Sequence, residues 1–323
     1  MLVVLLVAAL LFALWIAINL KTSRPDGVLI KKVHPYRLML GHIMPRRADA
    51  QVYFDVWARA DKIQAYVDAA RQRFPVDLTH VLVAAAGLGL MTNPRMNRFV
   101  VGRRLYQRNE TTVTFSAKRK RKDRKAKLTA IKHSFREGET FADFCQHINA
   151  QLATERSDKV TSTDREMNLL TRIPRPLMVR AVRIAQWLDY HNLLPAAFIK
   201  AEGMYCSAFV ANLGSLGMDP GYHHLYEWGT CPIFIMIGKI TEMGVVEDGQ
   251  MVIRKMLHLR YSFDERVDDA INCRSGFDGV NKAIEDPFTY LGCLAEDGSD
   301  AMPLLERGRL MCAEADRLDA DER

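Results

Sequence analysis

The chain opens on an unbroken apolar run and only afterwards alternates between apolar and polar positions. Met1 to Leu20 reads MLVVLLVAALLFALWIAINL, in which Asn19 is the one strongly polar side chain. A helix rises about 1.5 Å per residue, so this run is long enough to cross a hydrocarbon core of about 30 Å. No basic leading segment and no small-x-small cleavage site accompany it. The pattern therefore favours an uncleaved membrane anchor over a signal peptide.

The rest of the chain predicts a body in which strands and helices alternate. Gln51 to Trp57 has the every-second-residue pattern of a strand, and the helix at 78–91 begins after a cap at Asp77 or Thr79. Glu247-Asp248-Gly249 predicts a hairpin turn. The other predicted elements are helices at 60–73, 140–153 and 267–284, and strands at 99–107, 111–117, 128–133, 205–212, 231–240 and 251–263.

These patterns divide the chain into four segments. They are an anchor at 1–20, a linker at 21–45 rich in proline, glycine and basic residues, a domain at 46–295, and an acidic tail at 296–323. An inserted segment at about 165–200 mixes apolar residues with arginines. It predicts amphipathic helices that either lie on a lipid surface or pack on the body.

Composition and charge add a location. The 323 residues are 49% hydrophobic and 26% charged, which is enough apolar content for a full core. Basic residues follow the anchor, so the positive-inside rule predicts a single-pass protein whose body faces the cytoplasm. The six cysteines form no CxxC pair and have no histidines at zinc-ligand spacing, so we expect reduced, mostly buried thiols and no metal. The basic residues are Lys21, Arg24, Lys31 and Lys32.

The C-terminal half carries an ordered set of motifs: FVANLG at 209–214, CPIFIMIGK at 231–239, and LRYSFDERVDDA at 259–270. This order resembles the catalytic domain of the dihydrolipoamide acyltransferase component of 2-oxoacid dehydrogenase complexes, which shares its fold with chloramphenicol acetyltransferase. That family shows T-I-S-N-L-G, an aliphatic strand ending in glycine, and S-Y-D-H-R-x-x-D-G. The resemblance spans about 45–290. It implies a chloramphenicol-acetyltransferase-like two-layer α/β sandwich with a mixed sheet, assembled as a homotrimer or within a larger assembly. In this chain the domain would follow the N-terminal transmembrane helix expected from the apolar run.

The resemblance also implies an altered catalytic site. In the family, the histidine of D-H-R-x-x-D-G takes a proton from the acceptor thiol or hydroxyl. Glu265 stands at that position here, and Asp269 matches the aspartate four residues later. Ala211 stands where a serine or threonine stabilises the oxyanion, and Ala270 replaces the glycine. Glu265 serves as a base only if burial raises its pKa, and the alternative is an ion pair with an arginine.

A second pair of candidate bases lies between the family motifs. The stretch YHHLYEWG at 222–229 is similar to the H-H-x-x-x-D-G box of related acyltransferases, although Trp228 replaces the aspartate. Histidine side chains can act as bases near pH 7, so His223 and His224 are candidates, with Glu227 as the residue that would orient one of them. The alternative is a structural loop with aromatic packing.

The resemblance implies a coenzyme A thioester as substrate, bound by Asn212 and by part of a basic run. The run KRKRKDRKAK at 118–127 has eight basic side chains in ten residues. It is either a solvated hairpin tip, a patch for anionic lipid headgroups, or an attractor of coenzyme A phosphates. No nucleic-acid recognition motif accompanies it, so nucleic acid is not an expected partner. The candidate residues for coenzyme A are Lys118, Arg119, Lys120, Arg121 and Asn212.

Two functions follow from this sequence. The first is a membrane-anchored acyltransferase that moves an acyl group from coenzyme A to an unidentified acceptor, with a lipid among the candidates. The second is a catalytically inactive trimeric scaffold at the membrane. No lipoyl or peripheral-subunit-binding segment precedes the domain in this sequence. We therefore expect no lipoyl group on this chain and no ordinary role in a soluble 2-oxoacid dehydrogenase complex.

Overall fold

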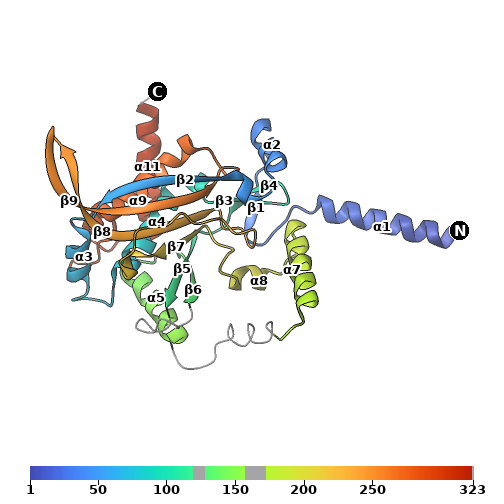
Figure 1. Ribbon diagram of the computed structural model, residues 1–323, viewed down its shortest axis with the longest axis horizontal. Helices are drawn as coiled ribbons and strands as arrows, with labels where there is room; N and C mark the ends of the chain where they lie inside the picture. The colour runs from blue at the N-terminus through green and yellow to red at the C-terminus, as the bar shows by residue number, and fades with distance from the viewer. Residues whose placement is uncertain (119–127, 157–171, 322–323) are drawn as a thin grey trace.

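Six strands form one mixed sheet that runs through the body of the computed structural model (Figure 1), which describes residues 1–118, 128–156 and 172–321. The strand order is β2-β9-β8-β7-β5-β6. β7 runs parallel to both of its neighbours, and the other pairs are antiparallel. The expected α/β fold with a mixed sheet is confirmed. The strands are β2 (Gln51–Arg59), β5 (Thr112–Lys118), β6 (Leu128–Ser134), β7 (Ala208–Asn212), β8 (Ile233–Glu247) and β9 (Gln250–Asp264).

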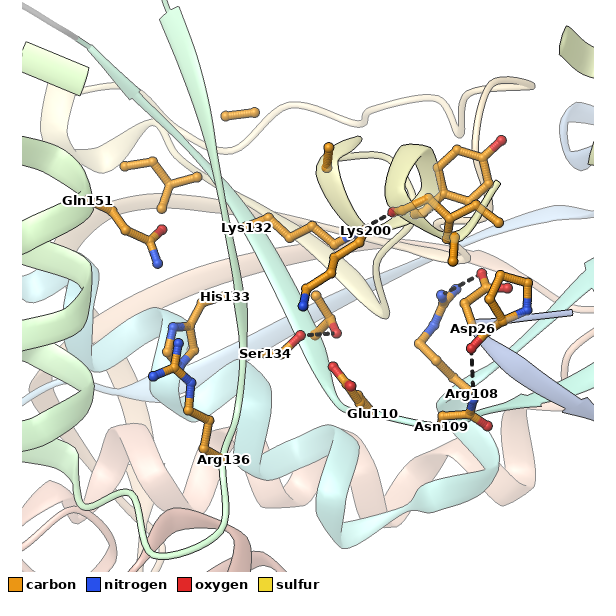
Figure 2. A pocket seen from close by; sticks show the side chains of 18 of the residues that line it. Asp26, Arg108, Asn109, Glu110, Lys132, His133, Ser134, Arg136, Gln151 and Lys200 are labelled. Atoms are coloured by element: carbon orange, nitrogen blue, oxygen red, sulfur yellow. Dashed lines mark hydrogen bonds and ion pairs between the residues drawn. The ribbon is translucent and has the colours of Figure 1, made fainter. Parts of the chain in front are cut away.

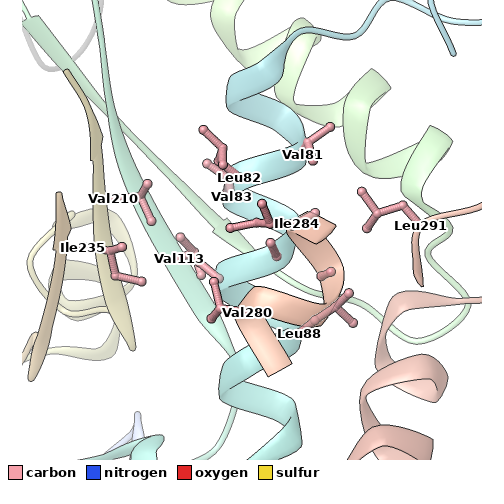
Figure 3. Packing of buried hydrophobic residues seen from close by; sticks show 14 of the residues in the cluster. Val81, Leu82, Val83, Leu88, Val113, Val210, Ile235, Val280, Ile284 and Leu291 are labelled. Atoms are coloured by element: carbon pink, nitrogen blue, oxygen red, sulfur yellow. The ribbon is translucent and has the colours of Figure 1, made fainter. Parts of the chain in front are cut away.

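Helices cover one face of this sheet and make the second layer. Contacts with the strands come from α4 (Leu78–Thr92), α5 (Phe141–Arg156) and α9 (Ala270–Glu285), while α3 (Ile63–Ala70) and α11 (Leu304–Asp321) pack on α4. Every residue of α4 from His80 to Thr92 is buried, which accounts for apolar residues on all sides of the helix. Figure 3 shows α4 packed against the sheet and α9. The labelled side chains are Val81, Leu82, Val83 and Leu88 of α4, Val113, Val210 and Ile235 of the strands, Val280 and Ile284 of α9, and Leu291 after α10.

The C-terminal segment expected as a tail contributes to this core. Leu304 and Met311 of α11 are buried. A side chain at Gly308 would meet the Met91 side chain at 2.4 Å, so α11 and α4 approach closely. The short helix α10 (Pro287–Tyr290) connects the end of α9 to this region.

A second, three-stranded sheet has the order β1-β4-β3, with β1 (Gly27–Leu29), β3 (Arg98–Val101) and β4 (Arg104–Arg108). The prediction of one strand over 99–107 is wrong, because Gly102 and Arg103 both have positive φ (56° and 61°) and turn the chain into a tight hairpin. The segment predicted as a linker supplies β1 and also α2 (Pro35–Ile43). Short 3-10 turns lie at Arg47–Ala50, Pro94–Met96 and Gly214–Leu216.

The predicted hairpin turn between β8 and β9 is present. Asp248 (φ 50°) and Gly249 (φ 78°) are its two central residues, and Glu247 pairs with Gln250. Positive φ at both positions is the geometry that joins two twisted antiparallel strands most closely.

Beyond the body, α1 (Leu2–Leu20) projects without a single buried residue (Figure 1). By length and composition it is able to cross a membrane. The inserted segment is helical where it is described: α7 (Arg175–Tyr190) lies beside the base of α1, and α8 (Ala196–Ala201) precedes β7. Residues 157–171 of the insert lie outside the described part of the chain.

Candidate functional site

A cavity of about 540 Å³ lies at the carboxyl end of β7, beside the N-terminus of α4. Its walls come from β5, α4, α5 and the turn that follows β7. Most of the lining is apolar: Leu78, Val83, Phe115, Ala117, Phe144, Ile148, Leu152, Ala211, Leu213 and Leu216. The polar groups are Arg71, Asp77, Thr79, His80, Ser116, Asn212 and Ser215. An apolar chamber with a few polar groups is the usual form of a small-molecule site.

The turn after β7 fixes Asn212 in this cavity. Its Oδ1 accepts a hydrogen bond from the backbone N–H of Ser215 at 3.1 Å, and its Nδ2 donates to Thr79 Oγ1 at 3.3 Å. Gly214 holds the turn against β8, because a Cβ there would lie 2.2 Å from the Gly238 carbonyl oxygen. The backbone position thus accepts only glycine, and Asn212 faces the start of α4.

At the start of α4, Asp77 and His80 form a pair that the sequence analysis did not select. Asp77 caps the helix by accepting from the backbone N–H groups of Thr79 and His80. Its Oδ1 also lies 2.9 Å from His80 Nδ1. His80 is 4% exposed, and its Nε2 is buried without a hydrogen-bond partner in the described structure. The sequence contained a signal for this pair, because Asp77 was an expected helix cap and a histidine three residues after a cap lies on the same helical turn.

The two contacts of His80 Nδ1 correspond to opposite tautomers. The Asp77 backbone N–H donates to Nδ1 at 3.1 Å, which requires a lone pair on Nδ1. The Asp77 carboxylate oxygen lies 2.9 Å from the same atom, which requires a proton on Nδ1. In the tautomer that donates from Nδ1 to the carboxylate, Nε2 carries the lone pair and is able to accept a proton.

Ala211 also lines the cavity but has no hydrogen-bond donor. The family hydroxyl expected at this position is therefore missing from the site. The neighbouring polar groups that line the same cavity are the amide of Asn212 and the hydroxyls of Ser116 and Thr79. These side chains are the available donors for a developing oxyanion.

Glu265 and Asp269 lie away from this cavity, near α2. Arg37 donates from Nη1 to the Glu265 backbone oxygen at 3.2 Å and from Nη2 to Asp269 Oδ2 at 3.0 Å. Asp269 also caps α9 by accepting from the Asn272 backbone N–H. Among the described residues no arginine forms an ion pair with the Glu265 carboxylate, because Arg266 is paired with Asp264.

The register of the sheet shows how far Glu265 is from Ala211 within one chain. Ala211 pairs with Met236, which pairs with Arg260. Glu265 is five residues beyond Arg260, which corresponds to roughly 17 Å of strand. The two positions that the resemblance assigns to catalysis are therefore not brought together by a single chain.

His223 and His224 lie over the sheet face opposite the main core. The His223 ring stacks on Phe234, with centroids 4.2 Å apart, and its Nδ1 lies 2.7 Å from the His224 backbone oxygen. Burial lowers the pKa of His223. Glu227 does not orient either ring, since its carboxylate accepts from the Ala48 backbone N–H at 3.1 Å. The arrangement has the aromatic packing of the structural alternative.

A second, more polar cavity of about 620 Å³ lies between β6, α5 and α8 (Figure 2). Three of its ionisable side chains are held by protein groups. Arg108 donates to Thr230 Oγ1 at 3.0 Å, Lys132 Nζ donates to the Ile199 oxygen at 2.8 Å, and His133 Nε2 lies 3.0 Å from Glu139 Oε2. No residue expected at the site from sequence lines this cavity. We therefore place the candidate site at the end of β7.

Of the residues expected to bind coenzyme A, Asn212 lies in the cavity, and the backbone of Lys118 ends β5, one of the cavity walls. Arg119, Lys120 and Arg121 lie outside the described residues. Within the described part of the chain, no group of three or more His, Cys, Asp or Glu side chains is arranged to hold a metal ion. All six cysteines are free, and five of them are buried.

Solved structures share this fold at low sequence identity. A probable dihydrolipoamide acetyltransferase from Listeria monocytogenes has a TM-score of 0.52 and 11% identity, and the match covers 84% of this chain and 97% of that chain. The cubic core of the pyruvate dehydrogenase multienzyme complex has a TM-score of 0.51 at 13% identity, covering 80% and 93%. Azotobacter vinelandii dihydrolipoamide acetyltransferase has a TM-score of 0.51 at 13% identity, covering 83% and 93%.

Comparisons that use the sequence alone find no related protein. No family model matches the chain, and a search of curated proteins gives no significant match. The fold expected from the motif order is thus confirmed by the structures, while identities of this size are evidence for fold and not for activity.

Proposed function

We propose that this protein is a membrane-anchored acyltransferase that moves an acyl group from a coenzyme A thioester to an acceptor hydroxyl or thiol. The observation that carries the proposal is the apolar cavity that the Asp77–His80 pair and Asn212 line together, with Asn212 bonded to Thr79 of the same helical turn. A base held by a carboxylate, next to hydrogen-bond donors and an apolar chamber, is what acyl transfer requires. The fold shared with dihydrolipoamide acetyltransferases supports it.

The chemistry needs few groups. His80 Nε2 takes the proton of the acceptor, whose oxygen or sulfur attacks the thioester carbon. Asn212 and Ser116 donate to the oxygen that becomes negative in the tetrahedral intermediate. The carbon–sulfur bond to coenzyme A then breaks, and the leaving sulfur takes the proton from the imidazolium. Asp77 keeps the proton on Nδ1 and stabilises the positive ring between these two steps.

The cavity also suggests which part of the donor it holds. Phe144, Ile148 and Leu152 form one continuous apolar wall from α5. Such a wall suits an acyl chain, while Arg71 at the cavity and the basic run of 118–127 are suited to the coenzyme A phosphates.

The membrane location and the assembly belong to the same proposal. α1 would span the bilayer, and the basic residues after it would keep the body in the cytoplasm. Protease protection in oriented vesicles tests this, since a body shielded only in right-side-out vesicles fits it and a body cut in them contradicts it. A homotrimer, or a larger particle, would join the Glu265 region of one chain to the cavity of the next. The shared fold with a cubic core supports this assembly.

The test uses the full chain in lipid nanodiscs. Binding of acetyl-coenzyme A and of a long-chain acyl-coenzyme A is measured by calorimetry, and turnover is measured as free coenzyme A by chromatography. We expect saturable binding, and we expect turnover to fall at least about 100-fold in His80→Gln and in Asp77→Asn with binding retained. His223→Ala is the matched control, with little change. Full activity of His80→Gln would remove His80 from the mechanism.

A scaffold without catalysis is the second candidate. The absence of a hydroxyl at Ala211 and the strand distance between Ala211 and Glu265 both favour it. A folded wild-type protein that binds neither acyl-coenzyme A in the calorimetric experiment would establish this candidate over the enzyme.

A further inference from the structure

The helix α7 has no buried residue along its whole length. Its large apolar side chains are open, with Leu177 53%, Ile184 58% and Trp187 48% exposed. A contiguous exposed apolar surface of this kind marks an interaction site in a protein that is otherwise well packed.

The C-terminal end of α7 is bound to the base of the anchor. Arg24 Nη1 lies 3.1 Å from Asp189 Oδ1, and Asn192, just past the helix, donates to the Lys21 oxygen at 3.1 Å. Arg104 donates to the same oxygen at 3.0 Å. Because α1 ends at Leu20, these contacts put α7 at the level where the chain leaves the apolar span.

The direction of α7 suits a membrane surface. Figure 1 shows α7 lying crosswise to α1, at the end of α1 that meets the body. If α1 runs along the bilayer normal, a helix crosswise to it at this level lies along the plane of the headgroups.

The side chains of α7 differ between the side that faces the body and the side that faces outward. Met178, Ala185 and Asp189 are half-buried, so they mark the side that packs on the body. At about 100° per residue, Trp187 falls on the opposite side, flanked by Arg180 and Arg183. A tryptophan between arginines on the outer side of a helix is the pattern of interfacial helices, in which the ring enters the headgroup region and the guanidinium groups meet phosphates.

The charge of the exposed surface selects the kind of lipid. Every exposed ionic side chain of α7 is cationic: Arg175, Arg180 and Arg183. The one acidic residue, Asp189, is 14% exposed and paired with Arg24. We infer that α7 lies flat on a membrane that contains anionic lipids, with Trp187 inserted among the headgroups. This inference rests on the anchoring role of α1 in the proposed function, and it is independent of the acyl-transfer chemistry.

The test reads the depth of single tryptophans in the full chain. The four tryptophans lie at 15, 57, 187 and 228. Three variants each keep one of Trp15, Trp57 or Trp187 and carry phenylalanine at the other three positions. Each is reconstituted in phosphatidylcholine vesicles with phosphatidylglycerol, made with lipids brominated either near the headgroup or near the chain end. Trp15 in α1 is the positive control, and Trp57 on the body is the negative control.

We expect Trp187 to be quenched by lipids brominated near the headgroup more than by those brominated near the chain end, Trp15 to be quenched, and Trp57 to be unaffected. Quenching of Trp15 without quenching of Trp187 would overturn the inference and leave the anchor standing. If neither is quenched, the anchor of the proposed function fails with it. A Trp187 shielded from both bromolipid and aqueous iodide would mean that another copy of the chain covers α7, which also overturns the inference.

A charge variant tests the choice of lipid. Arg180→Gln with Arg183→Gln, in the Trp187-only background, should lower Trp187 quenching by roughly twofold or more in vesicles with phosphatidylglycerol and by much less in phosphatidylcholine alone. Equal quenching of the variant and its parent in both vesicles would overturn the assignment to anionic lipid.

Discussion

The carboxylate of Asp264 and the guanidinium of Arg266, two residues apart in sequence, form a buried two-point ion pair. Nε lies 2.8 Å from Oδ1 and Nη2 lies 2.7 Å from Oδ2, with both side chains at most 4% exposed. Arg266 also donates to the Met44 oxygen at 3.0 Å, which ties the end of β9 to the segment before β2. The pair keeps Arg266 from pairing with the neighbouring Glu265.

Breaking this pair should destabilise the fold. Arg266→Met leaves the Asp264 carboxylate buried without its partner, which costs about 3–5 kcal/mol in the free energy of unfolding. Chemical denaturation monitored by circular dichroism measures the loss. Arg274→Met is the control, because Arg274 is 75% exposed and its ion pair with Asp278 is 3.7 Å long, so its effect should stay within about 0.5 kcal/mol. Equal effects of the two substitutions would contradict the structural role of the buried pair.

Glycine at 214 is required by the close approach of two backbones. Gly214→Ala would place a Cβ 2.2 Å from the Gly238 oxygen, so the turn that carries Asn212 must move or β8 must yield. We expect a loss of about 1–3 kcal/mol and weaker binding of acyl-coenzyme A. Thermal unfolding and calorimetry measure the two effects. Gly221→Ala, where a Cβ meets nothing within 4 Å, should be neutral or slightly stabilising.

The sequence predicted most of the fold because its periodic patterns are strong. α4 is a continuous apolar run because the helix is buried on all sides. β2 alternates between apolar and polar residues because only one of its faces is buried. The sequence did not predict the hairpin at Gly102 and Arg103, because arginine rarely adopts the positive φ that Arg103 has here. The tail was missed as a core element because α11 buries only scattered positions such as Leu304 and Met311.

The candidate site was harder to predict, for a different reason. The family motifs assigned the catalytic role to Glu265. The Asp77–His80 pair becomes a candidate only because the folded chain places its side chains in the same cavity as Asn212. Asn212 was selected from a motif, and the structure brings it to Thr79, which is distant in sequence. Only the tertiary arrangement of β7 and α4 reveals that relationship.

Asp55 should titrate far below an ordinary aspartate. A hydrogen bond from the Tyr222 hydroxyl, with further bonds from Arg260 and His258, lowers the pKa of Asp55 from 3.8 to about 2. Since the folded-state pKa is lowered, the stabilisation is fully present above about pH 4 and is lost as the pH falls toward 2. A carboxyl-carbon NMR titration measures the midpoint, and Tyr222→Phe should raise it. A midpoint near 3.8 in the unmodified protein would contradict the cluster.

The segment between α1 and α2 should be needed for the stability of the body. Arg24 is buried, pairs with Asp26 at 2.6 Å and with Asp189 at 3.1 Å, and lies beside β1, which pairs with β4. Burial raises the pKa of Asp189, so that carboxylate depends on its partner for its charge. Arg24→Met should therefore cost about 3–5 kcal/mol.

The same reasoning predicts where the chain can be cut to remove α1. A chain of residues 21–323 keeps Arg24 and β1, whereas a chain of residues 30–323 loses both and leaves Asp189 buried without its cation. We expect the shorter chain to melt roughly 6–20 °C lower, since a loss of about 3–5 kcal/mol corresponds to such a shift at about 2–4 °C per kcal/mol in a large domain. Differential scanning calorimetry of the two chains in the same buffer measures the difference in melting temperature. Equal melting temperatures would mean that the segment is a passive connection, and a drop that Arg24→Met reproduces within 21–323 would assign the effect to the buried arginine and not to β1.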